Sequence, residues 1–145
     1  MTTRLYSHSL SVEHITPPGH PERPDRIRVL DKIFEDQHFA GLERIEAPEA
    51  DPAYFELAHP ADFLKMVKDK IPESGIVTID ADTVASPKSW DVALRVSGAG
   101  MDAVDSVFTG MADNAFVSMR PPGHHAEKTT AMGFCLINNI AIAAR

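Results

Sequence analysis

Short apolar runs alternate along the chain with longer stretches in which apolar side chains recur every three or four residues. The short runs are typical of buried strands, and they occupy residues 4–7, 42–45 and 115–119. The helical spacing of about 3.6 residues predicts helices that begin at Pro24, at Asp51–Pro52, after His59–Pro60 and at Ser86–Pro87. Strands that alternate with helices predict an α/β fold, in which helices cover a parallel sheet.

The longest predicted helix runs from Ser86–Pro87 to about Phe108, with Gly110 just past its end. One apolar side of this helix is made by Trp90, Ala93, Leu94, Ser97, Met101, Val104 and Phe108. Gly98 and Gly100 interrupt it, although glycine weakens a helix by about 1 kcal/mol relative to alanine. The two glycines therefore predict a close approach of the helix to the sheet, or a kink.

Residues 140–145 predict a helix that Asn138 or Asn139 caps. Its alanines favour a helix, and no stop signal follows them. About two turns are too few for a stable isolated helix, so this end needs neighbours to pack against. The sequence therefore predicts that residues 1–145 are the amino-terminal portion of a single α/β domain, truncated after Arg145. An open sheet edge would then favour association into a homo-oligomer.

Composition indicates one folded unit in a reducing compartment. A hydrophobic content of 43% in 145 residues suffices for one core. No apolar run reaches the ~20 residues that span a bilayer, and the amino terminus lacks the apolar region of a signal peptide. The single cysteine, Cys135, excludes an intrachain disulfide and is predicted to be buried among its apolar neighbours. We therefore expect a cytoplasmic protein with no membrane partner.

The net charge of −7, from 21 acidic against 14 basic residues, bears on the class of partner. It argues against nonspecific nucleic-acid binding, which requires clustered lysines and arginines. It favours cationic partners such as lysine-rich peptides or polyamines through long-range attraction. Solubility explains the same charge equally well.

Two adjacent histidines, His124 and His125, are the strongest candidates for chemistry. They follow the apolar run 115–117 in a loop with Pro121 and Pro122, which have no N–H and cannot pair as a strand. In a parallel α/β sheet, a loop after a strand lies at the carboxyl edge, where ligands bind. Histidine is the side chain whose ordinary pKa suits proton transfer near neutral pH. The loop therefore predicts proton-transfer chemistry, although a histidine pair in a surface loop is often only solvated.

Three motifs resemble those of one family. One motif runs from RPPGHHA at residues 120–126 to GFCLINN at residues 133–139. Residues 19–26 (GHPERPDR) and 80–83 (DADT) resemble the first and second substrate loops. Together the motifs cover nearly the whole chain and resemble the histone deacetylase family, on its class II and bacterial amidohydrolase side, with the acetylpolyamine amidohydrolases. The resemblance implies the arginase/deacetylase α/β fold.

The resemblance also implies a zinc-dependent amidohydrolase. In the family an Asp-x-His pair and a second aspartate hold the zinc, and a tyrosine polarises the substrate carbonyl; their equivalents lie beyond Arg145. Neither His-x-x-Glu-His nor His-Glu-x-x-His occurs here, and one cysteine cannot make a thiolate cluster. We therefore expect Zn²⁺ in the complete family domain, and neither metal ligands nor activity in this chain alone.

By the same resemblance, His125 is the main general base and acid, and His124 is its electrostatic partner. Asp82 resembles the substrate-loop residue that accepts peptide N–H bonds, but it is equally typical of a turn before the long helix. Arg26 resembles a residue that lines the inner cavity through which acetate leaves, or else is a surface arginine on an amphipathic helix.

Two residues after the histidine pair complete the predicted site. By the same resemblance, Gly133 is expected to offer its backbone carbonyl to the substrate amide. Phe134 lines the acyl-lysine channel, with core packing as the alternative because buried aromatics dominate cores. The remaining histidines are predicted to have no specialised role, with His20 as loop structure; the others are His8, His14, His38 and His59.

The predicted function is therefore the amino-terminal part of a deacetylase that removes acetyl groups from acetyl-lysine or acetylpolyamine. Two alternatives stay open. One is a non-catalytic module that binds acyl-lysine. The other is one half of a split enzyme, completed by a second chain that carries the missing carboxyl-terminal half of the domain.

Overall fold

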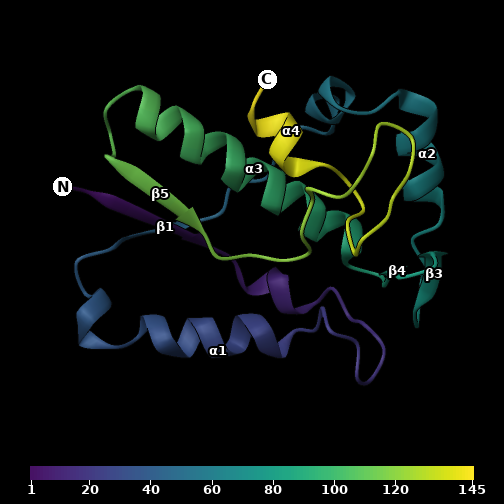
Figure 1. Cartoon of the computed structure of the whole chain (residues 1–145), viewed down its shortest axis with the longest axis horizontal. Coiled ribbons are helices and arrows are strands. Elements are labelled where there is room, and N and C mark those ends of the chain that lie inside the picture. The colour runs from purple at the N-terminus through teal and green to yellow at the C-terminus, as the bar shows by residue number, and fades with distance from the viewer.

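The centre of the architecture is a three-stranded parallel sheet ordered β2–β1–β5. A computed structural model describes all residues, Met1–Arg145. The strands are β1 (Thr3–Ser7), β2 (Glu43–Glu46) and β5 (Asn114–Val117). Helix α1 (Asp25–Phe34) lies below the sheet in Figure 1, and α3 (Ser89–Phe108) lies above it. The predicted α/β fold, with helices covering a parallel sheet, is confirmed.

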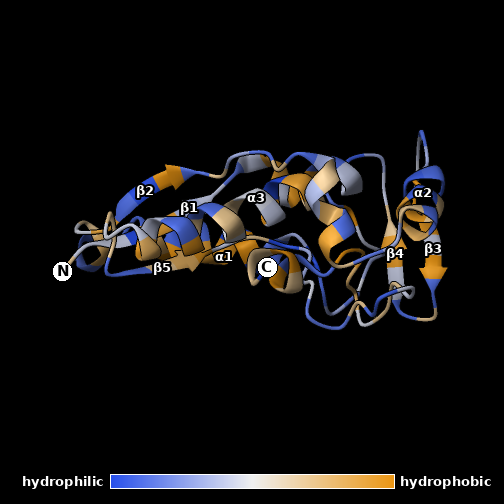
Figure 2. Ribbon diagram, turned by 90° about the horizontal axis from the view of Figure 1, so that it is seen from above, coloured by the Kyte–Doolittle hydropathy of each residue, from blue (hydrophilic) through white to orange (hydrophobic).

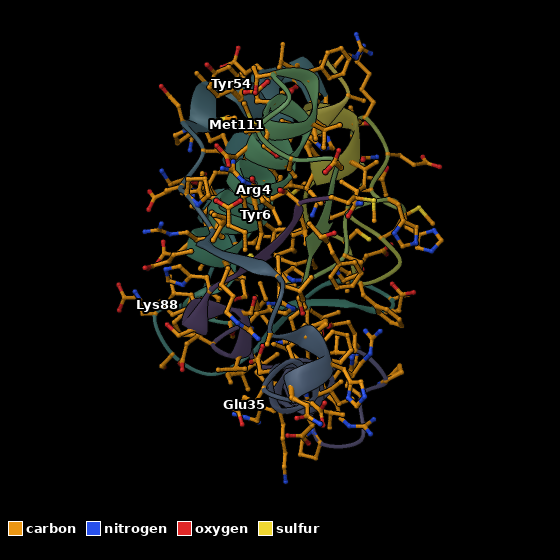
Figure 3. All side chains as sticks on the ribbon, turned by 90° about the vertical axis from the view of Figure 1, so that its left-hand side faces the viewer. Arg4, Tyr6, Glu35, Tyr54, Lys88 and Met111 are labelled. Carbon is orange, nitrogen blue, oxygen red and sulfur yellow. The ribbon has the colours of Figure 1, made fainter.

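Alternate residues of the strands face the two helices. Arg4 and Tyr6 project from the same side of β1 (Figure 3), and Tyr6 is fully buried, with its hydroxyl donating to Asp102 of α3 at 2.6 Å. Phe116 of β5 meets Phe34 of α1, with ring centroids 6.0 Å apart. Because successive side chains of a strand point to opposite faces of the sheet, the position of a residue in its strand decides which helix layer it contacts.

A larger core lies beside the sheet, around the first half of α3. It joins η3 (Pro52–Leu57), α2 (Ala61–Asp69), a hairpin of β3 (Val77–Asp80) and β4 (Thr83–Ala85), and α4 (Asn139–Ala143). Its largest buried side chains are Phe55, Phe63, Leu64, Val67, Trp90, Leu94, Leu136, Ile137 and Ile142. Figure 2 shows apolar segments of α2, α3 and β3 gathered at this end of the molecule. Two short 3-10 helices, η1 (Ser9–Val12) and η2 (Gln37–Phe39), lie in the loops.

The predicted elements are present, but the β3–β4 hairpin was not predicted. Its strands are short, and acidic residues interrupt the apolar pattern between them. Asp82 therefore lies in the turn of this hairpin. One of its two sequence interpretations placed it in a turn before the long helix, but α3 begins later, at Ser89. The helix predicted at Asp51–Pro52 is a 3-10 helix, η3, and the Asp51 side chain accepts from the N–H of Ala53 at 2.9 Å.

The glycines of α3 admit close neighbours. A Cβ on Gly98 would lie 2.2 Å from the carbonyl oxygen of Pro48, and one on Gly100 would lie 3.3 Å from the Cβ of Ala143. The helix is closely approached at both glycines, but by the loop after β2 and by helix α4, so the predicted partner, the sheet, is wrong. Both neighbours need the space that a missing side chain leaves.

The predicted apolar side of α3 is buried only in its first half. Trp90 and Leu94 belong to the larger core, and Met101 packs against it. Val104 is 39% exposed and Phe108 is 87% exposed. The apolar side predicted from the spacing therefore continues past the core, and no element of the chain covers its end at Phe108.

The carboxyl-terminal helix has the predicted cap. The Asn138 side chain accepts from the N–H of Ala141 at 2.9 Å, so Asn138 rather than Asn139 is the N-cap of α4. Asn139 instead packs against the preceding loop.

Two expectations from composition concern Cys135 and the membrane. Cys135 is fully buried as predicted, and burial raises the pKa of its thiol. No helix in the chain combines the length and apolarity needed to cross a membrane.

Candidate active site

The histidine pair lies on the loop that follows β5, beyond the carboxyl end of the sheet. His124 and His125 are exposed, with ring centroids 4.2 Å apart and an interplanar angle of 47°. Gly123 before them packs so closely on α4 that a Cβ would lie 2.0 Å from Oδ1 of Asn139. The loop is therefore held at its base, while both imidazoles can exchange protons with a bound molecule.

A turn made by Gly133 and Phe134 lies against the second histidine. Both residues have left-handed backbones, with φ of 60° and 68°. A Cβ on Gly133 would lie 2.6 Å from the Cβ of His125, so only glycine fits there. Phe134 is partly exposed, and its ring stands edge-on to His20 with centroids 4.9 Å apart. The turn therefore contacts His125 through Gly133, and its aromatic ring packs on His20.

The β3–β4 hairpin turn holds the backbone of this aromatic turn. Oδ1 of Asp82 accepts from the N–H of Gly133 at 3.0 Å. The hydroxyl of Thr83 accepts from the N–H of Phe134, also at 3.0 Å. These contacts bring Asp82 into the same region as His125, although 51 residues separate Asp82 from Gly133.

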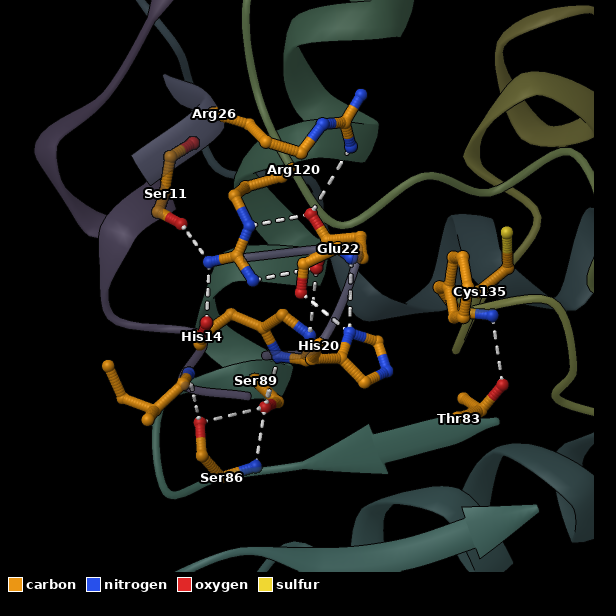
Figure 4. Close-up of polar contacts among 12 residues, drawn as sticks. Ser11, His14, His20, Glu22, Arg26, Thr83, Ser86, Ser89, Arg120 and Cys135 are labelled. Atoms are coloured by element: carbon orange, nitrogen blue, oxygen red, sulfur yellow. Dashed lines mark hydrogen bonds and ion pairs between the residues drawn. The ribbon is translucent and has the colours of Figure 1, made fainter. Parts of the chain in front are cut away.

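A buried ion pair joins Glu22 to Arg120, the residue that begins the histidine loop; Figure 4 shows the pair and its neighbours. Arg120 donates from Nε to Oε1 of Glu22 at 2.7 Å and from Nη2 to Oε2 at 2.6 Å. It also donates to the carbonyl oxygens of Ser11 and His14. The arginine thus ties the start of the histidine loop to the segment after β1. The sequence analysis predicted no role for Glu22 or Arg120. The only indication was that each is a charged residue inside a family motif, Glu22 in residues 19–26 and Arg120 in residues 120–126.

Comparison with known proteins identifies the family. A family model described as a histone deacetylase domain matches residues 20–145. The chain belongs to the histone deacetylase family. The resemblance that the sequence motifs carry is confirmed.

The following relatives are longer than this chain. The histone deacetylase-like amidohydrolase of Pseudomonas aeruginosa is 35% identical over 133 residues, which cover 89% of this chain and 35% of that protein. The polyamine deacetylase HDAC10 of Homo sapiens is 33% identical, over 85% of this chain and 19% of that protein. The crystal structure of the HDA15 HD domain superposes with a TM-score of 0.90 and 31% identity, covering 99% of this chain and 42% of that one. The chain spans less than half the length of each.

Arg26 lies apart from the other candidate residues of this histone deacetylase family member. Its side chain is more than half exposed, and Nη1 is 3.8 Å from Oε1 of Glu22. It borders a cavity of about 200 Å³ between α1 and β5, lined also by Ile27, Leu30, Phe116, Met119 and Arg120. The structure thus groups five predicted residues, His124, His125, Asp82, Gly133 and Phe134, and places Arg26 on the other side of the Glu22–Arg120 pair.

No group of three His, Cys, Asp or Glu side chains in residues 1–145 lies close enough together to hold a metal ion. The histone deacetylase family is zinc-dependent. That the zinc ligands lie beyond Arg145 stays a prediction.

Two histidines that were predicted to be unspecialised are buried parts of the structure. His14 is 1% exposed, and its Nδ1 lies 2.6 Å from the hydroxyl of Ser89. His59 is also 1% exposed; its Nε2 accepts from the N–H of Asn138 at 2.9 Å, and its Nδ1 donates to the carbonyl of Lys128 at 3.1 Å. Each ring satisfies buried polar groups from distant segments, a structural role that the sequence did not indicate.

We expect acid to destabilise the fold through His14. Burial, with the positive charge of Arg120 beside it, lowers the pKa of His14 from 6.5 to about 3. Below pH ~6.5 the His14 side chain binds a proton in the unfolded chain but stays neutral in the folded chain. The free energy of unfolding therefore falls by about 1.4 kcal/mol per pH unit until pH ~3, where the folded chain also binds the proton. Urea unfolding between pH 7 and pH 5 measures the slope. His14→Asn should flatten it, whereas substitution of the exposed His38 should not; equal slopes in the two variants would contradict the assignment.

Gly133→Ala should displace His125. The new Cβ meets the His125 Cβ at 2.6 Å, and the left-handed backbone adds strain of about 1–2 kcal/mol. Gly19→Ala is the matched control, since Gly19 has a φ of +80° with no atom within 4 Å of the added Cβ. Only Gly133→Ala should shift the NMR signals of the His125 ring. Unchanged signals would mean that the turn does not touch the histidine in solution.

Proposed function

We propose that residues 1–145 form the amino-terminal part of a zinc-dependent deacetylase that hydrolyses the amide of acetyl-lysine or acetylpolyamine. The observation that carries this proposal is the exposed pair His124–His125 against the Gly133–Phe134 turn, in a chain of the histone deacetylase family. The pair supplies proton-transfer groups, and the turn supplies an aromatic surface beside them.

Amide hydrolysis requires a base for the proton of the attacking water and an acid for the departing amine. His125 takes both parts in this proposal, because it is the histidine in contact with the aromatic turn. His124, with its ring 4.2 Å from that of His125, is the electrostatic partner. Two neighbouring imidazoles divide acid and base work when their surroundings separate their pKa values.

The substrate contacts come from the turn and the hairpin. The ring of Phe134 suits the aliphatic stem of an acylated amine. The carbonyl of Gly133 accepts only a weak bond from the Cys135 thiol, at 3.3 Å, and so keeps capacity for a substrate amide N–H. Asp82 is exposed and uses Oδ1 inside the chain, which leaves Oδ2 for a substrate donor. In this proposal the cavity that Arg26 borders is the one through which acetate leaves.

Zinc, held by residues outside this chain, would activate water and polarise the acyl carbonyl. Two of the relatives, an amidohydrolase and a polyamine deacetylase, act on acylated amines by name. The net charge of −7 supports a cationic substrate of either kind.

The test is turnover by the full-length protein that contains this chain, loaded with Zn²⁺. We expect hydrolysis of an acetyl-lysine peptide or of an acetylpolyamine, loss of turnover on chelation, and recovery when zinc is restored. Residues 1–145 expressed alone should show none. Binding of the acetyl-lysine peptide by the full-length protein without hydrolysis would support a non-catalytic module instead.

A further inference from the structure

We propose that Thr83 is a positioning residue, whose buried hydroxyl fixes the backbone of Phe134 and so adjusts substrate binding rather than the chemical step. The inference rests on the proposed function for the role of Phe134. Thr83 itself was no candidate from the sequence, where it stands as an ordinary member of a polar loop.

The hydroxyl of Thr83 is the centre of a closed hydrogen-bond network. It accepts from the N–H of Phe134 at 3.0 Å and donates to Oδ1 of Asp82 at 3.0 Å. The same Oδ1 accepts from the N–H of Gly133 at 3.0 Å. Both amides of the turn are thereby satisfied by one threonine and one aspartate. Figure 4 shows the Thr83 oxygen bonded to the segment that carries Cys135.

The turn needs such support because its backbone is unusual. Phe134 has a φ of 68°, a region that side chains with a Cβ rarely adopt and that persists only when the surroundings hold it. Gly133 before it also has a positive φ, which glycine adopts without a steric penalty, so Phe134 is the residue whose backbone depends on outside contacts.

Thr83 is rigidly placed. It is 0% exposed, begins β4, and pairs with Asp80 of β3. Two residues later Ala85 enters the larger core. The hydroxyl therefore connects the packed interior to a turn that is itself partly exposed.

Loss of this hydroxyl should affect Phe134 more than His125. The N–H of Gly133 keeps its bond to Asp82, so the contact between Gly133 and His125 remains. The N–H of Phe134 loses its only acceptor. The ring is then free to leave the position in which it would meet the acylated stem, which weakens binding and spares proton transfer.

The experiment uses the full-length, zinc-loaded protein and an acetyl-lysine peptide. Thr83→Val keeps the volume and removes the hydroxyl, and Thr83→Ser keeps the hydroxyl. We expect Thr83→Val to raise KM about tenfold while kcat stays within about twofold, and Thr83→Ser to stay near the wild-type values. Thr16→Val is the control, because the Thr16 hydroxyl is buried without a partner and its loss should change neither constant.

Hydrogen exchange gives a readout independent of activity. The Phe134 amide should be protected in the wild type and in Thr83→Ser, and it should exchange fast in Thr83→Val. Fast exchange in the wild type, or an unchanged KM in Thr83→Val, overturns the proposal. Should Thr83→Val not fold, slow wild-type exchange with an unchanged KM in Thr83→Ser supports it.

The two proposals fail in different ways. A wild-type protein that hydrolyses neither acetyl substrate rejects the proposed function, and with it the role of Thr83 in binding, even if the Phe134 amide is protected. Turnover with an unprotected Phe134 amide rejects the role of Thr83 alone.

Discussion

His125→Ala should lower kcat of the full-length, zinc-loaded protein by about 10²–10⁴-fold, the usual contribution of a general acid–base. The ring is exposed beside His124 and rests on the Gly133 turn, so its removal takes away the proton carrier without opening the core. Binding of zinc and of a competitive inhibitor should stay nearly intact. Steady-state kinetics on an acetyl-lysine peptide, with calorimetric inhibitor binding, measure the two effects.

Two neighbouring substitutions serve as controls for His125→Ala. His124→Ala should cost less in kcat, because an electrostatic partner leaves the proton path in place. Phe134→Ala should act mainly on KM, since it removes an aromatic surface that binds the substrate. Near-normal turnover in His125→Ala would show that the histidine pair does not have these roles.

Glu22→Ala should lower the free energy of unfolding by about 3–5 kcal/mol, the range found when one partner of a buried pair is removed. Glu22 is 1% exposed and accepts two hydrogen bonds from Arg120, which is 2% exposed. The substitution leaves the guanidinium buried without its counter-charge. Urea unfolding near pH 7 measures the change, and Arg120→Ala should cost a similar amount.

Arg26→Ala is the matched control for the ion pair. Arg26 contacts the same carboxylate at 3.8 Å but is mostly exposed, so its loss should cost no more than ~1 kcal/mol. Combined replacement of Glu22 and Arg120 by leucine and methionine should recover much of the lost stability, because no unpaired charge remains. An equal decrease in the free energy of unfolding in Arg26→Ala and Glu22→Ala would show that burial of the Glu22–Arg120 pair does not increase its contribution to stability.

The candidate site could be predicted only in part. His124, His125, Gly133 and Phe134 lie in one short stretch, so a local motif places them near one another. Asp82 was named through family resemblance alone, because 51 residues separate it from the turn that it binds. Its second contact, through Thr83, had no sequence signal.

Hydrophobic periodicity by itself determined the strands of the sheet, the amphipathic helices and their α/β order, because periods of two and about 3.6 residues follow from local backbone geometry. The residue types indicated which chemical groups the chain carries, above all the two imidazoles of His124 and His125. The tertiary structure alone decided that Glu22 pairs with Arg120 across 98 residues, that His14 is buried, and that Thr83 meets Phe134. These contacts depend on how separate loops pack at one end of a sheet. Neither the burial of a polar side chain nor its pairing with a distant residue produces a periodic pattern in the sequence.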